Sequence, residues 1–295
     1  MQNFAIRVPA TSANLGPGFD SFGLALTLYN TFHIRQSKSY EIHFTDKNVE
    51  LDPKNNLILK AYSNTCTKHN WSQQTFILNI ENNLHFSSGL GSSSTAVVAG
   101  VVIAYMLNDY PLDKDSLLLD ALDIETHIDN IGAAIYGGFI IGMVDIAKVR
   151  KITVDKPLVC WVITPHMKIN TDLSRQTLPD TVSMNHSVHN ISHAAAVAID
   201  IAQGNFANLR LDMTDKLHQE YRVGEKLKYQ ALQTKLYSCN QVYSISLSGS
   251  GPSLLVLASQ ITDSIRQVVQ MHFADINIAY TVHELEVDNQ GLTVM

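Results

Sequence analysis

The segment SSGLGSSSTAVVAG, residues 87–100, contains the residue types that can hold a phosphate group. Gly89 and Gly91 let the backbone approach a ligand closely and adopt positive φ angles. Ser92 and Ser93 follow at the expected start of a helix, where unpaired N–H groups and the helix dipole favour an anion. A serine hydroxyl there could also bind Mg²⁺, which prefers oxygen ligands. A serine-capped helix after a tight turn explains the segment alone equally well, and it is not a Walker A loop because no lysine follows the glycines.

A second segment, VPATSANLGPGFDSFGLAL (residues 8–26), places a polar, turn-forming stretch between two expected strands. This stretch contains Asn14, Gly16, Gly18 and Asp20. A hairpin needs only a few residues, whereas about ten polar or small residues intervene here. Because loops of that length in a compact domain usually bind something, we expect a ligand at this loop. A long solvent-exposed connection is the alternative.

Two further segments are weaker signals. In SLSGSGPSLLVLA, two expected strands flank Gly249 and Gly251, a pattern that is by itself more typical of a hairpin turn. In DIETHIDNIGAAIYGG, the polar residues crowd together where a helix is expected to stop. A carboxylate there could hold Mg²⁺, while Asp129 could equally cap the next helix. The residues of this cluster are Glu125, His127, Asp129 and Asn130.

Positioning these segments requires elements that bring distant parts of the chain together. The first half alternates strand-like and helix-like patterns. Strands are expected at residues 4–9, 24–35, 40–44, 75–80, 138–144 and 152–154, and helices at 56–68, 92–108 and 114–126. The second half predicts strands at 158–164, 243–247, 253–257 and 278–285, and helices at 185–203, 206–223 and 261–273.

These elements predict an α+β protein of two domains. A shift in composition near residues 154–157 suggests a boundary between a domain at 1–154 and a domain at 155–295. The second domain has the pattern of an antiparallel sheet with helices on one face. A chain of 295 residues exceeds the usual size of a single domain, which favours the same division.

The composition excludes several classes of protein. The chain is 45% hydrophobic and 16% charged, which is unlike a disordered chain. Its net charge of −6 argues against non-specific binding to nucleic acid or to an anionic membrane. The three cysteines are scattered and form no CxxC pair, so neither a disulfide framework nor a zinc knuckle is expected. With no secretory or membrane-spanning pattern, we expect a cytoplasmic protein.

Taken together, the segments resemble the GHMP kinases, the superfamily of galactokinase and of homoserine, mevalonate and phosphomevalonate kinases. GLGSSST resembles the phosphate loop of that superfamily and SGSGPS its third motif, while PATSANLGPGFDSFGLAL is similar to the homoserine kinase branch in particular. The resemblance covers most of the chain, in matching order. It implies a two-domain GHMP kinase fold, with a left-handed β-α-β unit in the N-terminal domain and a ferredoxin-like C-terminal domain.

The resemblance also implies an activity and its ligands. The protein would phosphorylate the hydroxyl of L-homoserine with ATP and Mg²⁺, in threonine biosynthesis, and homodimers are common in the family. A kinase for another small alcohol, such as mevalonate, is the nearest alternative. Because mevalonate has no ammonium group, Asp20 together with two arginines favours an amino acid. A sensor that binds ATP and a metabolite without turnover is the other alternative.

The residues with implied roles fall into three sets. The ATP set comprises Asn56 at the base, and Ser87, Ser88, Gly89, Leu90, Gly91, Ser92, Ser93 and Ser94 at the phosphates. The metal set comprises Ser93 and Glu125. The acceptor set comprises Asn14, Asp20, His127, Arg175, Arg222 and Gly249. The catalytic candidates are Glu125, Asp129 and Asn130.

Within these sets, Asp20 would pair with the substrate ammonium. Arg175 and Arg222 would clamp its carboxylate, a role that suits the planar fork of arginine. No residue has to be a general base, and Asp129 is the candidate for that role.

The chain departs from the family pattern at the entry to the phosphate loop. His85 stands where the family usually has proline, and Ser88 stands where bacterial homoserine kinases often have a basic residue. The loss of proline would loosen this entry, and the loss of the basic residue would remove one phosphate contact.

Overall fold

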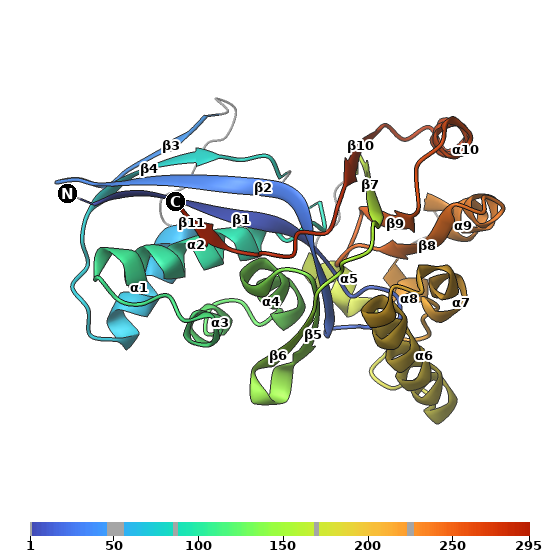
Figure 1. The fold of residues 1–295 in the computed structure, drawn as a ribbon, viewed down its shortest axis with the longest axis horizontal. Helices are drawn as coiled ribbons and strands as arrows, with labels where there is room; N and C mark the ends of the chain where they lie inside the picture. The colour runs from blue at the N-terminus through green and yellow to red at the C-terminus, as the bar shows by residue number, and fades with distance from the viewer. Residues whose placement is uncertain (1, 46–55, 85–87, 168–170, 223–226) are drawn as a thin grey trace.

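The structure is a computed structural model that describes residues 2–45, 56–84, 88–167, 171–222 and 227–295 (Figure 1). The strands are β1 (Asn3–Ala13), β2 (Phe22–Gln36), β3 (Glu41–Phe44), β4 (Phe76–Glu81), β5 (Phe139–Met143), β6 (Lys148–Ile152), β7 (Val159–Pro165), β8 (Val242–Leu247), β9 (Leu254–Ala258), β10 (Tyr280–Leu285) and β11 (Thr293–Val294). The helices are α1 (Leu57–Lys68), α2 (Ser92–Leu107), α3 (Lys114–Leu122), α4 (Ile128–Tyr136), α5 (Thr171–Gln176), α6 (Met184–Gln203), α7 (Leu209–Asp212), α8 (Gln219–Arg222), α9 (Tyr229–Tyr237) and α10 (Asp263–Asp275), with the 3-10 turns η2 (Val144–Ile146) and η3 (Phe206–Asn208).

The first sheet has seven strands and carries its helices on one side. Its order is β11-β1-β2-β4-β3, and β5 joins β2 to β6. Helices α1 to α4 lie below this sheet in Figure 1. Helix α2 is apolar on nearly all sides because it is buried against the sheet and against α1. Gly100 permits this close packing, since a Cβ atom there would lie 2.3 Å from the carbonyl oxygen of Ile58.

The β-α-β unit expected from the family resemblance is formed by β3, α1 and β4. These two strands pair in parallel, with Glu41 opposite Ile77 and Phe44 opposite Ile80. The other strand pairs of this sheet are antiparallel. The left-handed sense of the crossover stays a prediction.

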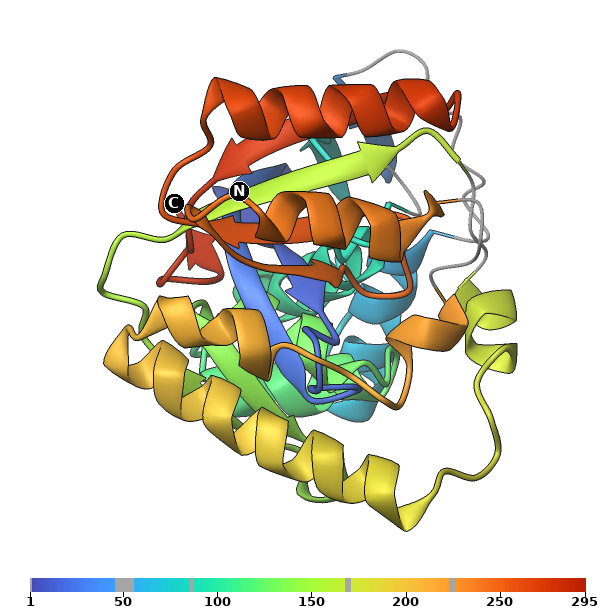
Figure 2. The ribbon, with the colours of Figure 1, turned by 90° about the vertical axis from the view of Figure 1, so that its right-hand side faces the viewer.

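The second sheet has the ferredoxin-like strand order. Its four antiparallel strands are arranged β10-β7-β9-β8, the order in which the fourth strand lies beside the first and the third beside the second. Trp161 and Ile163 of β7 face α9 and α10, which contribute Leu232 and Phe273 to the same core. Helices α9 and α10 cover this face of the second sheet, and Figure 2 shows α6 along the bottom of the molecule.

The expectation that helices cover only one face of the second sheet is wrong. Cys160 and Val162 of β7 point to the opposite face, and they pack with Val197 and Ile201 of α6. The same core includes Leu24 of β2, from the first sheet. The second sheet is therefore covered on both faces, and its inner face is also where the two sheets meet.

Most expected elements are present, with several corrections. The helix expected at 206–223 is broken into η3, α7 and α8, because Asp215 between them accepts hydrogen bonds from three backbone N–H groups that follow it. The helix expected at 114–126 ends at Leu122, and the strand expected at 152–154 is found at Lys148–Ile152. Helices α5 and α9 and strand β11 were not expected.

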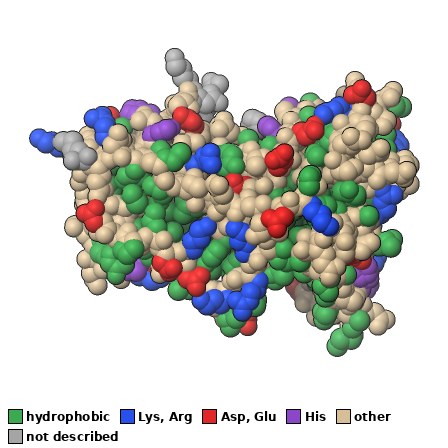
Figure 3. Space-filling model, in the orientation of Figure 1, with side chains coloured by type: hydrophobic (Ala, Val, Ile, Leu, Met, Phe, Trp, Pro, Cys, Tyr) green, Lys and Arg blue, Asp and Glu red, His purple; other side chains and the backbone are tan. Residues whose placement is uncertain are grey.

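The last residues of the chain return to the first sheet. Ile6 of β1 pairs with Val294 of β11, so part of the expected second domain completes the first sheet. The division at residue 154 stays a prediction. Among the described residues, no helix combines the length and apolar character needed to cross a bilayer. Acidic and basic side chains are interspersed over the face shown in Figure 3.

A buried carboxylate joins α1, α2 and α3. The side chain of Asp120 is only 3% exposed, and it accepts hydrogen bonds from Tyr105 Oη at 2.7 Å and His69 Nε2 at 2.8 Å. Lys68 Nζ lies 2.8 Å from its other oxygen. Burial alone would raise the pKa of Asp120, but the bonds from Lys68, Tyr105 and His69 outweigh it and hold this pKa below its ordinary value.

We expect Asp120→Asn to lower the free energy of unfolding at pH 7 by about 2–3 kcal/mol, because it leaves buried donors poorly paired. The folded pKa is lower than the unfolded one, so the stabilisation is present above about pH 4 and is lost as the pH falls through the folded value. Urea unfolding at pH 7, 5 and 3.5 measures both effects.

Asp123→Asn is the matched control, because Asp123 is an exposed partner of the same Lys68, with its Oδ2 2.6 Å from Nζ. That variant should lower the free energy of unfolding by less than about 1 kcal/mol. A loss for Asp120→Asn that does not diminish at low pH would contradict the assignment.

Candidate active site

The three glycine-containing segments meet between the two sheets. The N–H of Thr11, in β1, donates to the carbonyl oxygen of Leu90 at 3.1 Å. The N–H of Gly249 donates to the carbonyl oxygen of Ala13 at 3.0 Å. Ser248 Oγ donates to the carbonyl oxygen of Gly89 at 2.6 Å. Segments from the beginning, middle and end of the sequence thus form one hydrogen-bonded unit, which we call the glycine junction: residues 11–13, 88–91 and 248–253.

The glycines of the phosphate-loop segment are required by the backbone. Gly89 and Gly91 have φ angles of +82° and +69°. A Cβ atom on Gly91 would lie 2.0 Å from Thr11 Oγ1, so any other residue would clash there unless Thr11 moved. Gly91 is the N-cap of α2, and no side chain among the described residues caps this helix. The first turn of α2 therefore presents its N–H groups and its positive dipole end to the space in front of it.

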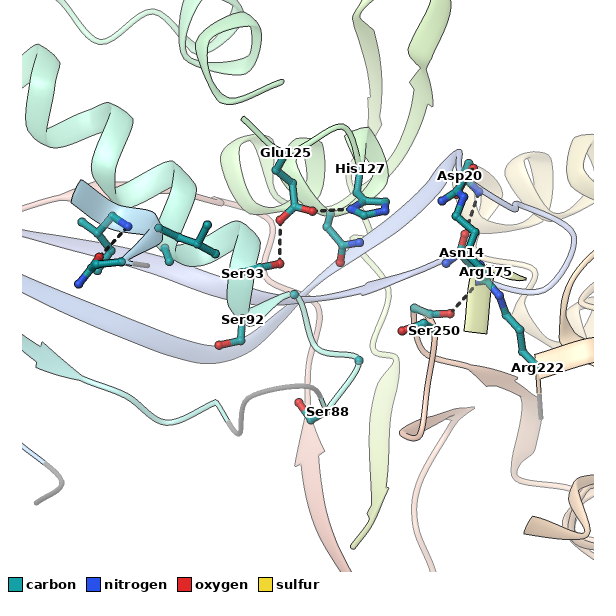
Figure 4. A pocket seen from close by; sticks show the side chains of 18 of the residues that line it. Asn14, Asp20, Ser88, Ser92, Ser93, Glu125, His127, Arg175, Arg222 and Ser250 are labelled. Carbon is teal, nitrogen blue, oxygen red and sulfur yellow. Dashed lines mark hydrogen bonds and ion pairs between the residues drawn. The ribbon is translucent and has the colours of Figure 1, made fainter. Parts of the chain in front are cut away.

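A pocket of about 470 Å³ opens in front of α2 (Figure 4). Most of the residues expected from the sequence line it: Asn14, Asp20, Asn56, Ser88, Gly89, Gly91, Ser92, Ser93, Glu125, His127, Asn130, Arg175, Arg222 and Gly249. The expected Leu90, Ser94 and Asp129 are not in its lining. The expected Ser87, and His85 at the loop entry, lie outside the described residues.

Oxygen atoms gather beside the first turn of α2. Ser93 Oγ donates to Glu125 Oε2 at 2.7 Å, and Ser94 Oγ donates to the same oxygen at 3.2 Å. His127 Nδ1 pairs with the other carboxylate oxygen of Glu125. Burial alone would raise the pKa of Glu125, but hydrogen bonds from His127 and Ser93 lower it below its ordinary value. The hydrogen bond with Glu125 raises the pKa of His127.

This arrangement suits a cation that is also bound by a ligand. Among the described residues, no group of three His, Cys, Asp or Glu side chains could form a complete metal cage. Glu125 and Ser93 offer a carboxylate and a hydroxyl at a helix N-terminus, where phosphate oxygens would supply further ligands. The donor set therefore fits Mg²⁺ held jointly by protein and phosphate.

One interpretation of the sequence was that Asp129 caps the next helix. This interpretation is wrong. The N-cap of α4 is His127, and Asp129 lies in the first turn of that helix. Its carboxyl is 1% exposed and accepts from the backbone N–H of Asn130 at 2.9 Å. Burial raises the pKa of Asp129 to about 6. Asn130 itself faces the pocket, where Thr11 Oγ1 donates to its Oδ1 at 2.9 Å.

Charged groups of both signs gather at the opposite end of the pocket (Figure 4). Asp20 forms an ion pair with Arg175, and Asn14 Oδ1 accepts from the backbone N–H of Asp20 at 2.8 Å. Arg222 is buried, with its Nη1 3.5 Å from the carbonyl oxygen of Gly249. This end of the pocket, which we call the acceptor end, therefore offers one anion and two cations to a ligand.

The third part of the pocket is largely apolar. Asn56 caps α1, since its Oδ1 accepts from the backbone N–H of Ile58 at 2.9 Å. The Nδ2 atom of Asn56 is buried and has no hydrogen-bond partner among the described residues. Phe44, Leu57 and Ala96 line the same region. An apolar slot with one unused N–H donor fits a flat heterocycle with acceptor nitrogens, as in a purine base.

Sequence reasoning missed one aromatic residue at the acceptor end. The guanidinium of Arg222 lies 4.9 Å from the ring centroid of Phe19, and that of Arg175 lies 5.6 Å from it. Such distances are typical of cation–π contacts. No pattern in the sequence marks Phe19, because both arginines come from the other half of the chain.

Comparisons with known proteins agree with this geometry. The family model described as GHMP kinases N terminal domain matches residues 56–138. The homoserine kinase of Helicobacter hepaticus is 37% identical over 301 residues, covering 98% of this chain and 99% of that protein. The homoserine kinase of Halothermothrix orenii is 34% identical, covering 98% of this chain and 95% of that protein.

The fold is also shared with a solved structure. The crystal structure of homoserine kinase from Cytophaga hutchinsonii superposes with a TM-score of 0.88 at 24% identity, covering 100% of this chain and 98% of that one. The expected fold class is thereby confirmed. On the identity and coverage of its relatives, the chain belongs to the homoserine kinase family of the GHMP kinases.

Proposed function

We propose that this protein is a homoserine kinase, which transfers the γ-phosphoryl group of ATP to the hydroxyl oxygen of L-homoserine and releases ADP. The observation that carries the proposal is one continuous pocket with two complementary ends. One end has the helix N-terminus and oxygen ligands of a phosphate site, and the other has the Asp20 carboxylate beside Arg175 and Arg222. A role in threonine biosynthesis, a cytoplasmic location and a homodimeric state stay predictions.

ATP would lie with its base in the apolar slot and its phosphates at α2. Asn56 Nδ2 is the donor available to the base. The backbone from Ser88 to Ser92 would surround the phosphates, aided by the helix dipole. Ser88 is buried at the pocket, so it would contribute its backbone and hydroxyl where a basic side chain is more usual in the family.

Ser93 and Glu125 would hold Mg²⁺. Bound there, the ion would neutralise charge on the phosphates and fix their orientation. The hydrogen bonds from His127 and Ser93 lower the pKa of Glu125, which favours the ionised carboxylate that a cation requires.

L-Homoserine would bind through its charged groups at the acceptor end. Asp20 would accept the ammonium, while Arg175 and Arg222 would bind the carboxylate. This orientation would direct the side-chain hydroxyl towards His127, which lies between Glu125 and Asp20 in Figure 4, and towards Asn130, which lines the same pocket. Asn14 supports Asp20, because its Oδ1 accepts a hydrogen bond from the backbone N–H of Asp20.

Positioning and charge neutralisation supply most of the acceleration in phosphoryl transfer, because the transition state is loose. A strong general base is not required. Asp129 is buried behind Asn130 and outside the pocket lining, so its effect on the acceptor hydroxyl would pass through Asn130. Glu125 and Asn130 are therefore the catalytic candidates that reach the pocket directly.

The test is ADP release by the purified protein with Mg²⁺ and ATP, using L-homoserine, L-serine, L-threonine, mevalonate and galactose as acceptors. Turnover that needs Mg²⁺ and strongly prefers L-homoserine would support the proposal. Turnover with mevalonate or galactose instead would retain the kinase but overturn the substrate. ATP binding without turnover of any acceptor would favour a sensor.

Asp20→Asn should raise the KM for L-homoserine by about tenfold or more, because a charge-assisted bond to the ammonium is lost. The KM for ATP should change by less than about twofold, since Asp20 lies at the other end of the pocket. Steady-state kinetics with each substrate varied in turn gives both values.

Asp109→Asn is the matched control for this change. Asp109 has the same positive φ angle, +53°, and lies outside the pocket. It should leave both KM values unchanged. An equal rise in the KM for ATP and for L-homoserine in Asp20→Asn would show a general disturbance instead of a lost ammonium contact.

Glu125→Gln should lower kcat by about 100-fold and shift the Mg²⁺ dependence to higher concentrations, because an amide is a weaker ligand for a hard cation. Titration of activity with Mg²⁺ at saturating ATP measures this. Glu81→Gln is the control: Glu81 also pairs with a histidine, His33, at 2.9 Å, but it is half exposed and does not line the pocket. A Glu125→Gln variant with an unchanged Mg²⁺ requirement would remove Glu125 from the metal site.

A further inference from the structure

The loop that carries Asn14 and Asp20 rests on a buried histidine. The side chain of His218 is 0% exposed, and its Nε2 lies 2.9 Å from the carbonyl oxygen of Gly16. A carbonyl oxygen can only accept, so this nitrogen carries the hydrogen and donates it. Burial lowers the pKa of His218, so the ring is neutral near pH 7. A neutral histidine thus holds residues 14–21, which we call the acceptor loop, through a backbone carbonyl group.

A second buried residue fixes the position of His218. Asp215 accepts from the backbone N–H groups of His218 at 2.8 Å and Gln219 at 2.7 Å. Asn190 of α6 donates to Asp215 at 2.8 Å and to the carbonyl oxygen of Pro17 at 3.2 Å. Burial alone would raise the pKa of Asp215, but the hydrogen bonds from Asn190 and from the backbone N–H groups of Gln219 and His218 help to keep it below its ordinary value. The backbone at the start of α8 is therefore rigidly tied to the acceptor loop.

The same short helix carries Arg222. The backbone N–H of Arg222 donates to the carbonyl oxygen of His218 at 3.2 Å, so the two side chains leave adjacent turns. The ring of Phe19 connects them: it stacks on the His218 ring at a centroid distance of 5.2 Å, with an interplanar angle of 23°. The Arg222 guanidinium lies 4.9 Å from that same ring. His218 therefore contacts the two parts of the chain that present the anion and the cation.

The ammonium and carboxylate of an α-amino acid are attached to the same carbon atom, so the groups that bind them must be held at one fixed separation. Asp20 and Arg222 come from opposite halves of the sequence, and nothing local sets their spacing. The contacts of His218 with Gly16 and with Phe19 supply that constraint. Pre-organisation of this kind strengthens binding without touching the ligand.

We propose that His218 is a positioning residue for the acceptor: by holding Gly16 and Phe19, it sets the spacing between the Asp20 carboxylate and the Arg222 guanidinium. The inference rests on the proposed function and deepens it, because it assigns amino-acid selectivity to a residue that the substrate does not contact. A purely structural histidine would affect folding stability but not the KM for one substrate.

The experiment compares His218→Leu with His218→Gln, whose amide can still donate to the Gly16 carbonyl. Wild-type turnover of L-homoserine is measured first, and its absence would overturn the proposed function and this inference together. His218→Leu should raise the KM for L-homoserine by about tenfold, and that for ATP by less than about twofold. His218→Gln should recover most of the lost affinity.

His272→Leu is the matched control. His272 is also buried, and its Nε2 lies 2.9 Å from the carbonyl oxygen of Leu227, away from the acceptor loop. This variant should lower the thermal midpoint but leave the KM for L-homoserine unchanged. If His218→Leu behaves in the same way, with a lower midpoint and an unchanged KM, the positioning role is overturned.

Phe19→Leu tests the same inference where His218→Leu does not yield folded protein. Phe19 is only partly buried, and leucine retains much of its apolar volume. It removes the stack on His218 and the contact with Arg222, so we expect the KM for L-homoserine to rise about fivefold. An unchanged KM in Phe19→Leu would show that the ring does not transmit the position of His218 to the arginine.

Discussion

The glycine junction is the constraint on which the rest of the structure depends. Its backbone hydrogen bonds join β1, the start of α2 and the turn between β8 and β9, and they also join the two sheets. Because these bonds use backbone groups, they need glycine where a side chain would intrude, as at Gly91 beside Thr11. The phosphate end of the pocket is thus built from the same contacts that hold the two halves of the molecule together.

The acceptor end is supported in a different way, through buried side chains. Asn190 donates to Asp215 and to the carbonyl oxygen of Pro17, and His218 donates to the carbonyl oxygen of Gly16, all with little exposure to water. The phosphate of a nucleotide is a general ligand that helix termini bind readily, whereas an amino acid must be distinguished by the spacing of its charges. A rigid set of side chains can be adjusted residue by residue, which suits the part of the site that selects the acceptor.

The sequence predicted the long elements and most of the pocket lining, because periodic apolar patterns and glycine-rich segments are local signals. It failed where a tertiary contact decides the local structure. The break between α7 and α8 depends on the burial of Asp215 against α6, and strand β11 exists only because β1 offers a free edge. Phe19 was missed because its partners, Arg175 and Arg222, are distant in sequence. The prediction that Asp129 caps a helix was wrong because α4 begins at Ile128, one residue before it.

The ion pair between Asp20 and Arg175 affects how the proposed substrate would enter. An arriving zwitterion would not bring two new attractions into an uncharged site; it would exchange one existing pair for two others. Dissolved salt weakens the pair that is given up as well as those that replace it. Affinity for the amino acid should therefore vary less with ionic strength than the number of charges suggests. The pocket should select among ligands by the spacing of their charged groups more than by overall electrostatic attraction.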